Sequence, residues 1–477
     1  MQAGSRQPGT RLGNVRIRRG RRSTQVVDVR EIKVARPTRA SPLYLIAGFA
    51  VLIAIGTGLL LLPIATRSGA SPGLTTALFT STSAVCVTGL VVVDTHDYWS
   101  PFGQAVILLL IQLGGLGFMA SATLLILLFG GRLSLRQRLL ARDTLGRLGV
   151  ERVGQLIRRI IVTTLAIEFV GSALMVIALV LADRSFTPQH IWRGVFIAIS
   201  AFNNAGFDIE GGYRSLAAYR ANVLLLAVTG SLVILGGTGF AVWSDVVRQR
   251  TWRRLTLDTK LVLVTSVALW GLGALVIIGL ESRPGGLFNG ITPHVRALDA
   301  LWMSVVARTA GFSVFDLSLM SGSTLFFMAA LMFIGGASAS TAGGIKLTTF
   351  SSLFFAILAS LRGDEHVTVF GREISWRQIN RALAIALLSV AAVFVLAFSV
   401  SLTIEEPFER MLFESVSALA TVGLSTGVTP DLDDVARVML VIGMFVGRLG
   451  PLTIGLALAG RMRATRVRYP EEQISIG

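Results

Sequence analysis

Four short stretches of similar sequence decide the fold of this chain: Val87-Thr88-Gly89-Leu90, Asn204-Ala205-Gly206-Phe207, Thr309-Ala310-Gly311-Phe312 and Thr421-Val422-Gly423-Leu424. Their glycines lie 117, 105 and 112 residues apart. Each stretch closes a modest apolar segment that is too short to cross a bilayer, and these segments are Leu74 to Leu90, Ile191 to Phe207, Arg296 to Phe312 and Phe408 to Leu424. Similarity at a nearly constant spacing indicates internal repeats.

The four segments also agree at positions before their glycines. Ten residues before the glycine stand Phe79, Phe196, Leu301 and Phe413. Six residues before it stand Ser83, Ser200, Val305 and Ser417. The agreement predicts four copies of one unit, a half-helix followed by a loop. Surface turns capped by glycine are the alternative, but they give no reason for a shared register.

Long apolar runs flank these segments. They cover residues 43–65, 102–130, 158–182, 221–245, 260–281, 323–360, 381–404 and 436–460. Each is long enough for a membrane-spanning helix, which needs about 20 residues. We therefore expect an all-α membrane protein with eight spans, built as four pseudo-fourfold repeats of span, re-entrant pore half-helix with filter loop, and span. The expected repeats are residues 41–130, 156–247, 259–361 and 378–460.

The composition supports this class. Of the 477 residues, 53% are hydrophobic and 15% charged, and the mean hydropathy is +0.69. Soluble domains carry about 25% charged residues. The sequence shows no catalytic triad, paired carboxylates or phosphate-binding loop, which argues against a membrane enzyme. The four histidines lie far apart and suggest no metal site, and the lone cysteine, Cys86, excludes an internal disulfide.

The basic residues are placed on one side of the predicted membrane. Of the 44 Lys and Arg residues, 32 fall in segments 1–40, 131–160, 246–260, 361–381 and 461–477. The positive-inside rule makes this side cytoplasmic, so both termini are expected there, in a plasma-membrane protein. The basic tail 1–40 is expected to be disordered, and 461–477 forms a second cytoplasmic tail. A net charge of +17 also suits nucleic-acid binding, but this placement favours membrane orientation.

Four such loops around one axis predict a cation pathway. Non-helical backbone at membrane depth must line water or be buried in protein. Rings of carbonyl oxygens there can replace the hydration shell of an ion, and the half-helix C-termini favour cations. Glycine provides the backbone angle that the loop requires. We expect Leu90, Phe207, Phe312 and Leu424 to wedge the loops from behind, and Ser83, Ser200 and Ser417 to hold half-helix to loop.

A glycine-rich patch recurs in the span after each loop. The patches are Gly114-Gly115-Leu116-Gly117, Gly236-Gly237-Thr238-Gly239, Gly335-Gly336-Ala337-Ser338 and Gly447-Arg448-Leu449-Gly450. The third continues in small residues to Gly344. Glycine is about 1 kcal/mol worse than alanine at each helix-interior position, so we expect a broken helix there. Close helix packing is the alternative explanation.

These motifs resemble the Trk/Ktr/HKT superfamily of potassium transporters, most closely its KtrB-type membrane subunit. The four loops carry the resemblance together with Gln112 to Phe118, Gly335 to Lys346 and Gly447 to Pro451, over about 41–460. The resemblance implies a gated, channel-like potassium uptake pore, with potassium bound at the carbonyls of the four quoted loops. Glycine at all four positions favours potassium, and sodium as an activator stays open.

The resemblance also implies a gate and partners. The gate comprises Gly335, Gly336, Ser338, Ser340, Thr341, Gly343 and Gly344, with Arg448 as a positive barrier beneath the filter. A structural ion pair is the alternative for Arg448, whose burial at mid-membrane costs at least about 2.5–3.5 kcal/mol. The implied partners are a second copy in a homodimer, a KtrA/TrkA-like cytoplasmic nucleotide-binding ring and membrane lipids, with no nucleic acid and no covalent cofactor.

Other acidic residues have smaller expected roles. We expect Glu168 and Glu414 to be hydrogen-bonded structural carboxylates. Asp94, Asp208 and Asp316 follow the loop glycines and suggest an acidic vestibule, with ordinary solvation as the alternative. A secondary transporter with alternating access, coupled to sodium or protons, is the competing function. Such transporters use inverted repeats, whereas these repeats run in one direction.

Overall fold

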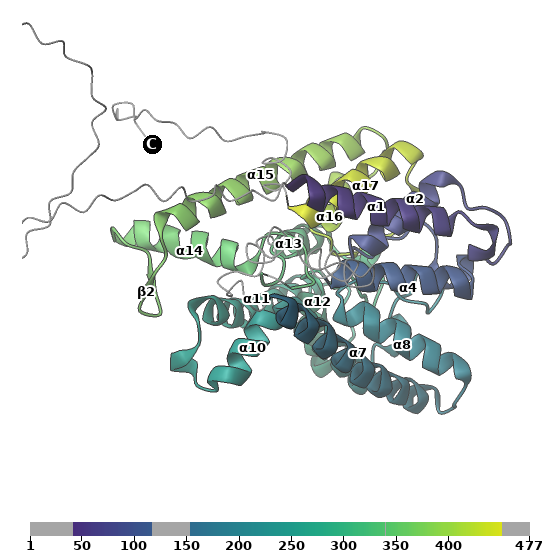
Figure 1. The fold of residues 1–477 in the computed structure, drawn as a ribbon, viewed down its shortest axis with the longest axis horizontal. Helices are drawn as coiled ribbons and strands as arrows, with labels where there is room; N and C mark the ends of the chain where they lie inside the picture. The colour runs from purple at the N-terminus through teal and green to yellow at the C-terminus, as the bar shows by residue number, and fades with distance from the viewer. Residues whose placement is uncertain (1–41, 117–152, 339, 451–477) are drawn as a thin grey trace, which may run out of the picture. The chain divides into compact units, whose positions relative to one another are not determined.

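The computed structural model describes residues 42–116, 153–338 and 340–450 (Figure 1). All of them belong to one compact unit, Ala40–Gly477. The predictions for the tails 1–40 and 461–477, for 117–130 and 131–152, and for Pro451 fall outside the described residues.

The described chain is mostly helical and has almost no strand, as predicted. Among the described residues, three single helices are long and apolar enough to cross a membrane: α7 (Val153–Asp183), α11 (Leu257–Glu281) and α15 (Trp376–Ser401). Shorter apolar helices are α1 (Pro42–Leu60), α4 (Pro101–Gly115), α13 (Gly322–Phe333) and α14 (Leu347–Arg362), and α17 (Asp434–Leu449) closes the described chain. The protein is therefore a multi-pass membrane protein by length and composition of its helices.

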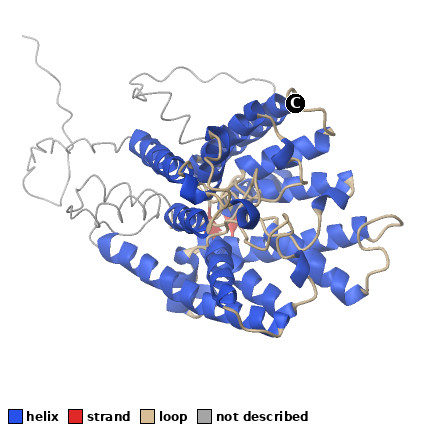
Figure 2. Ribbon diagram, turned by 90° about the vertical axis from the view of Figure 1, so that its right-hand side faces the viewer, coloured by secondary structure: helices blue, strands red, loops and turns tan. Residues whose placement is uncertain are grey.

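Four half-helices lie where the sequence predicts them. They are α2 (Leu74–Val85), α8 (Pro188–Phe202), α12 (Pro293–Val306) and α16 (Phe408–Leu419). With 12 to 15 residues each, they are shorter than a helix that spans the membrane. Each ends four or five residues before its loop glycine. Figure 2 shows loops gathered among the helices at the centre of the view.

One predicted span differs from the structure. The run 221–245 forms two helices, α9 (Val223–Thr238) and α10 (Phe240–Gln249), bent by 92°. The bend falls at Gly239, whose φ of 78° is left-handed and open to glycine at little cost. The run thus forms two helices instead of one, and the pair together is still long and apolar enough for one broken span. The run 323–360, in contrast, breaks between α13 and α14 as predicted.

Small elements complete the chain. Helix α3 (Thr95–Tyr98) follows the first loop. A two-stranded antiparallel hairpin of β1 (Thr368–Val369) and β2 (Arg372–Glu373) joins α14 to α15. Five short 3₁₀ turns cover Pro63–Ala65, Ala217–Tyr219, Trp252–Arg254, Leu317–Leu319 and Thr429–Asp431.

Two large apolar clusters show how the parts join. The first contains residues of α7 to α9 and α11 to α13 together with Phe413 and Leu424 of the fourth segment. The second contains residues of α1, α2, α4, α16 and α17 together with Phe196 and Phe207 of the second segment. Helix α17 also packs on α2. The end of the described chain therefore returns to its beginning.

A buried carboxylate joins the end of α11 to the start of α13. Glu281 is fully buried and accepts hydrogen bonds from the Leu287 N–H at 2.8 Å and the Ser321 N–H at 3.1 Å. It also accepts from the hydroxyls of Ser321 and Thr324, at 2.9 and 2.5 Å. One side chain thus satisfies four donors.

Replacing this carboxylate should destabilise the fold. Glu281→Ala leaves buried donors without an acceptor, at about 1–3 kcal/mol for each such group. We expect a melting temperature several degrees below wild type for the purified protein in detergent, and a smaller loss for Glu281→Gln. The control Glu365→Ala changes an exposed loop residue and should melt like wild type. Equal melting of the two alanine variants would contradict this role.

Candidate functional site

The four loop glycines meet in ring order. At each glycine, a Cβ atom would lie within 2.7 Å of the backbone of the next loop. The nearest atoms are the Ala205 carbonyl oxygen for Gly89 (2.3 Å), the Gly311 Cα for Gly206 (2.7 Å), the Val422 carbonyl oxygen for Gly311 (2.7 Å) and the Thr88 carbonyl oxygen for Gly423 (2.2 Å). The first loop thus touches the second, the second the third, the third the fourth, and the fourth the first. Any side chain at these positions requires the loops to move apart.

Each loop also repeats one backbone pattern. The residue two before the glycine has a positive φ: Val87 56°, Asn204 57°, Thr309 70° and Thr421 49°. The glycines follow at 96°, 70°, 76° and 91°. Three of the four non-glycine residues are β-branched, and for these a left-handed angle is strongly disfavoured. Strain of this kind persists only where the surroundings impose it, and it clusters at functional sites.

Serine side chains hold two of the loops. The Gly89 N–H donates to the Ser83 Oγ at 3.1 Å, and the Gly423 N–H donates to the Ser417 Oγ at 3.1 Å. These two predicted roles are confirmed. The Ser200 hydroxyl has no hydrogen-bond partner among the described residues, so the role predicted for it is wrong. In the second loop a backbone contact stands at this place, from the Ala205 N–H to the Ser200 carbonyl at 2.8 Å.

The residues after the glycines are buried as predicted. Leu90, Phe207, Phe312 and Leu424 are at most 1% exposed. Phe207 and Leu90 belong to one apolar cluster, and Phe312 and Leu424 to the other. The loops are therefore backed by apolar side chains on all four sides.

The glycine patches pack against the ends of the half-helices. A Cβ at each of three patch glycines would lie much too close to a carbonyl oxygen. The distances are 2.0 Å from Gly114 to Val85, 1.8 Å from Gly236 to Phe202 and 1.7 Å from Gly447 to Leu419. Each of these carbonyls belongs to the residue four before the loop glycine. Close packing thus explains these three patches, in the same register each time. The third patch differs, because Gly335 packs on the Gly343 carbonyl of its own segment, at 1.8 Å.

Residues 334–346, here called the third-patch segment, are not helical where described. The Gly335 N–H donates to the Ile345 carbonyl at 2.9 Å, and the Leu347 N–H donates to the Gly336 carbonyl at 3.0 Å. These two hydrogen bonds hold the beginning and the end of the segment side by side. It bonds to the second patch through the Ala337 N–H and the Gly237 carbonyl, 3.0 Å apart. The broken helix is confirmed.

The third-patch segment also contacts the end of one half-helix and one of the loops. Thr341 Oγ1 donates to the Phe202 carbonyl at 3.4 Å, at the end of α8. A Cβ at Gly343 would lie 1.9 Å from the Thr421 Oγ1 and 2.6 Å from the Ala420 carbonyl, in the fourth loop. Two of the predicted gate residues, Thr341 and Gly343, therefore lie against the end of α8 and against the fourth loop.

Arg448 joins this segment to two other parts of the chain. Its Nη1 donates to the Thr341 carbonyl at 2.5 Å and its Nη2 to the Gly114 carbonyl at 2.9 Å. Within the described residues no carboxylate lies within ion-pair distance of it. The alternative of a structural ion pair finds no partner there, and Arg448 keeps an uncompensated positive charge.

A buried arginine, Arg308, was not singled out from the sequence. Arg308 is 6% exposed, its Nη2 donates to the Gly335 carbonyl at 3.2 Å, and its guanidinium lies 5.7 Å from the Trp270 ring centroid. Its Nε and Nη1 have no partner among the described residues. The signal was present in the sequence, since Arg308 stands where the other loops have Cys86, Asn203 and Ala420.

The two intramembrane carboxylates are hydrogen-bonded, as predicted. Glu168 accepts from Gln112 Nε2 at 2.8 Å and from Asn203 Nδ2 at 2.9 Å. It thereby ties α7 to α4 and to the second loop. Glu414 accepts from the Thr426 N–H at 2.7 Å and from the hydroxyls of Ser425, Thr426 and Thr429. It fixes the chain just after the fourth loop.

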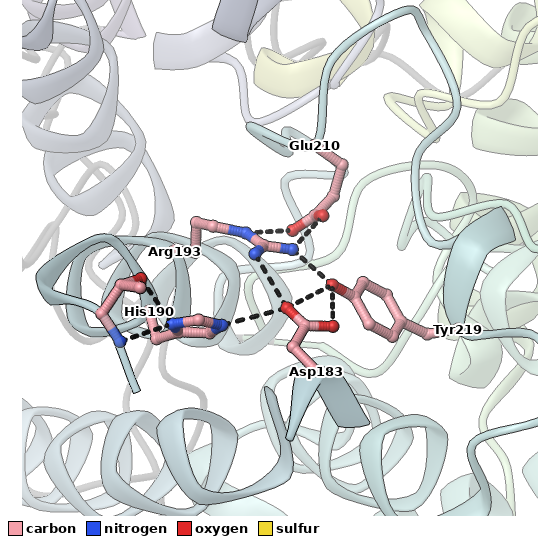
Figure 3. A network of polar contacts seen from close by, with 6 residues as sticks. Asp183, His190, Arg193, Glu210 and Tyr219 are labelled. Carbon is pink, nitrogen blue, oxygen red and sulfur yellow. Dashed lines mark hydrogen bonds and ion pairs between the residues drawn. The ribbon is translucent and has the colours of Figure 1, made fainter. Parts of the chain in front are cut away.

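A polar network that the sequence analysis missed fixes the start of α8 (Figure 3). His190 Nε2 lies 3.0 Å from the Asp183 carboxylate, and the His190 Nδ1 accepts the Thr187 N–H at 3.1 Å. Arg193 bonds to Asp183, to Glu210 beyond the second loop and to the Tyr219 hydroxyl. The second half-helix is thus tied at its first turns to the end of α7 and to the segment after its loop.

The acidic residues beyond the loops make local hydrogen bonds. Asp94 caps α3 and accepts the Tyr213 N–H at 2.8 Å, which links the segments that follow the first and second loops. Asp208 accepts the Glu210 N–H at 3.1 Å. Burial raises the pKa of the Asp208 carboxyl to about 7, with the Glu210 and Asp94 charges acting in the same direction.

Comparison with known proteins shows which family has a similar sequence. The chain matches the model of a family described as "TrkH: Cation transport protein" over residues 25–463. It is 38% identical to the Ktr system potassium uptake protein B of Bacillus subtilis, over 93% of this chain and 99% of that protein. It is 37% identical to the potassium/sodium uptake protein NtpJ of Enterococcus hirae, over 92% and 98%.

A solved structure shares the fold. The potassium transporter TrkH from Vibrio parahaemolyticus superposes with a TM-score of 0.68, at 17% sequence identity, covering 89% of this chain and 85% of that one.

The raised pKa of Asp208 predicts a pH-dependent stability. The folded protein keeps this proton up to a pH of about 7, whereas an unfolded chain releases it near a pH of about 3.9. Stability should therefore fall as the pH rises through this window. Asp208→Asn removes the titrating group, so above pH 7 we expect it to melt at a higher temperature than wild type in detergent. The control Asp364→Asn changes an exposed loop residue, and identical pH profiles for wild type and Asp208→Asn would refute the assignment.

Proposed function

Because the chain belongs to the TrkH family of cation transport proteins, we propose that it takes up potassium through a gated, channel-like pore. Relatives 37–38% identical over most of the chain are named Ktr system potassium uptake protein B, and we assign this chain the corresponding role of ion-translocating subunit. The observation that carries the proposal is the ring order of the four loop glycines. It brings backbone from four distant parts of one chain to one place.

The four loops form the proposed selectivity filter. Left-handed residues alternate along each loop, at the glycine and two positions before it, which suits a strand of backbone whose successive carbonyls face one axis. The hydroxyls of Thr88, Thr309 and Thr421 are buried without a partner among the described residues. Oxygen atoms of this kind are the ligands that hard monovalent cations prefer. Potassium is the proposed substrate, and the name of NtpJ supports a role for sodium as well.

The third-patch segment forms the proposed gate. It lies against the end of α8 and the fourth loop, and Arg448 holds it through the Thr341 carbonyl. A positive charge in this low-dielectric place raises the energy of a passing cation. Arg308 holds the segment from the other side through Gly335, so we propose that it links the third loop to the gate.

The wider architecture follows the family. We propose eight spans in four repeats around one axis, with both termini in the cytoplasm and the protein in the plasma membrane. The return of α17 to α2 supports a closed arrangement of the repeats. A homodimer and a cytoplasmic nucleotide-binding regulatory ring complete the proposed assembly.

Replacing the first loop glycine should abolish potassium preference. A side chain at Gly89 meets the Ala205 carbonyl at 2.3 Å and a φ of 96°. For Gly89→Ser we expect the ratio of potassium to sodium uptake by purified protein in liposomes to fall about tenfold, which is about 1.4 kcal/mol of selectivity. The control is Gly58→Ala, where a Cβ meets nothing within 4 Å. An unchanged ratio in a folded Gly89 variant would remove the filter assignment.

Shortening the proposed gate should increase flux. Deleting residues 338–342 removes the Thr341 carbonyl that Arg448 binds and the contact with the end of α8. We expect faster rubidium uptake into liposomes, with the variant eluting and melting like a folded protein. Uptake equal to wild type in such a folded deletion would argue against a gate.

A further inference from the structure

A cavity with an unusual lining lies beside the fourth loop, between the third-patch segment and helices α14, α15 and α17. Its volume is about 190 Å³. Its polar lining comprises Lys346, Thr349, Arg381, Ser389 and Arg448. Three of these side chains are cationic, and the described residues that line the cavity include no carboxylate.

The three cationic side chains differ in the number of hydrogen bonds that they make to the protein. Arg448 donates to the Thr341 and Gly114 carbonyls, and the Lys346 Nζ donates to the Ala342 carbonyl at 2.5 Å. The guanidinium of Arg381, an exposed residue like Arg377 before it, makes no hydrogen bond or ion pair within the described chain. The same holds for the hydroxyls of Thr349 and Ser389, although Ser389 is only 4% exposed.

This set of groups suits an anion. Three positive charges around one cavity, two of them on partly buried side chains, repel one another unless an anion offsets them. A guanidinium with free N–H groups and two free hydroxyls are donors, and together they match the oxygen atoms of a phosphate group. The lining is therefore complementary to a negatively charged, oxygen-rich group.

The remaining lining indicates that the ligand is an amphiphile. Arg381, Ile385 and Ser389 follow at intervals of four on one face of α15, and Phe333 and Leu419 add apolar surface across the cavity. On α15 itself, Leu383 and Leu387 are 48% and 61% exposed, as expected for a helix in contact with lipid. Basic pockets between membrane helices on the cytoplasmic side bind anionic headgroups.

We propose that this cavity binds an anionic phospholipid, with its phosphate at Arg381 in the field of Lys346 and Arg448 and its upper acyl chain along Ile385 and Leu419. The inference rests on the membrane orientation in the proposed function but not on transport. Because two of the cations hold Thr341 and Ala342 of the third-patch segment, a bound lipid lies in direct electrostatic contact with the proposed gate.

Lipid binding can be measured directly on the full-length protein. Native mass spectrometry of the detergent-purified protein would compare phosphatidylglycerol with phosphatidylcholine of the same acyl chains. We expect the wild type to prefer phosphatidylglycerol, and Arg381→Ala to lose about fivefold of that preference, the effect of one basic side chain near an anionic surface. Arg381→Lys keeps the charge and should retain most of it.

The matched control is Arg377→Ala, which removes an exposed arginine one turn earlier on the same helix and outside the cavity. It should bind phosphatidylglycerol like wild type. Equal binding by Arg377→Ala and Arg381→Ala would overturn the site. If Arg381→Ala fails to fold, Arg381→Gln replaces it in the same comparison.

A competition arm separates the two sources of phosphate. Excess inorganic phosphate should leave phosphatidylglycerol bound, because the acyl chain contributes to binding. Displacement of the lipid by inorganic phosphate would overturn the lipid proposal in favour of a free anion. Potassium uptake into liposomes, measured in parallel, distinguishes loss of this site from failure of the proposed function, since a variant without lipid preference can still select potassium.

Discussion

The close approach of backbone from four distant parts of the chain is the constraint on which the rest of the structure depends. The next loop lies so close to each of the four loop glycines that a Cβ atom would not fit between them. These glycines are Gly89, Gly206, Gly311 and Gly423. Backbone packed this tightly requires residues without side chains at the contact and strained, left-handed residues beside it. The buried wedge residues, the serine hydrogen bonds and the carboxylate of Glu414 all serve to hold this arrangement in place.

The other distinctive features connect to the loops through short contacts. The glycine patches let the following helices touch the ends of three half-helices, and in the third repeat the same position opens into the third-patch segment. Two arginines, the buried Arg308 and the partly buried Arg448, hold that segment through its backbone carbonyls. Because neither has a carboxylate partner within the described residues, the positive field beneath the loops is not cancelled there. In the proposed pore this uncancelled charge raises the energy of a passing cation, and an anion bound beside it would weaken the same field.

Predictions from the sequence were right where a residue acts on its own stretch of backbone. They were wrong or incomplete where residues from other parts of the chain determine the contact or the conformation. Ser83 and Ser417 bond the glycine N–H of their own loops, but Ser200, at the matching position, does not. Residues 221–245 are apolar enough for one span, yet Gly239 permits a 92° bend that hydropathy does not record. Arg308 was visible as an odd charge within a loop, but its contact with Gly335 and the Trp270 ring joins residues far apart in the chain.

The amino-acid sequence by itself determined the membrane class, the four half-helices, the four loop glycines and the break in the third patch. These follow from hydropathy, from residue spacing and from the conformational freedom of glycine, all of which act within a few residues. Only the tertiary structure decided the order in which the loops meet, the carbonyl partners of Arg448 and Arg308, the network around His190 and the basic cavity beside α15. Each of these joins groups from separate segments, and their distance in space depends on how the helices pack.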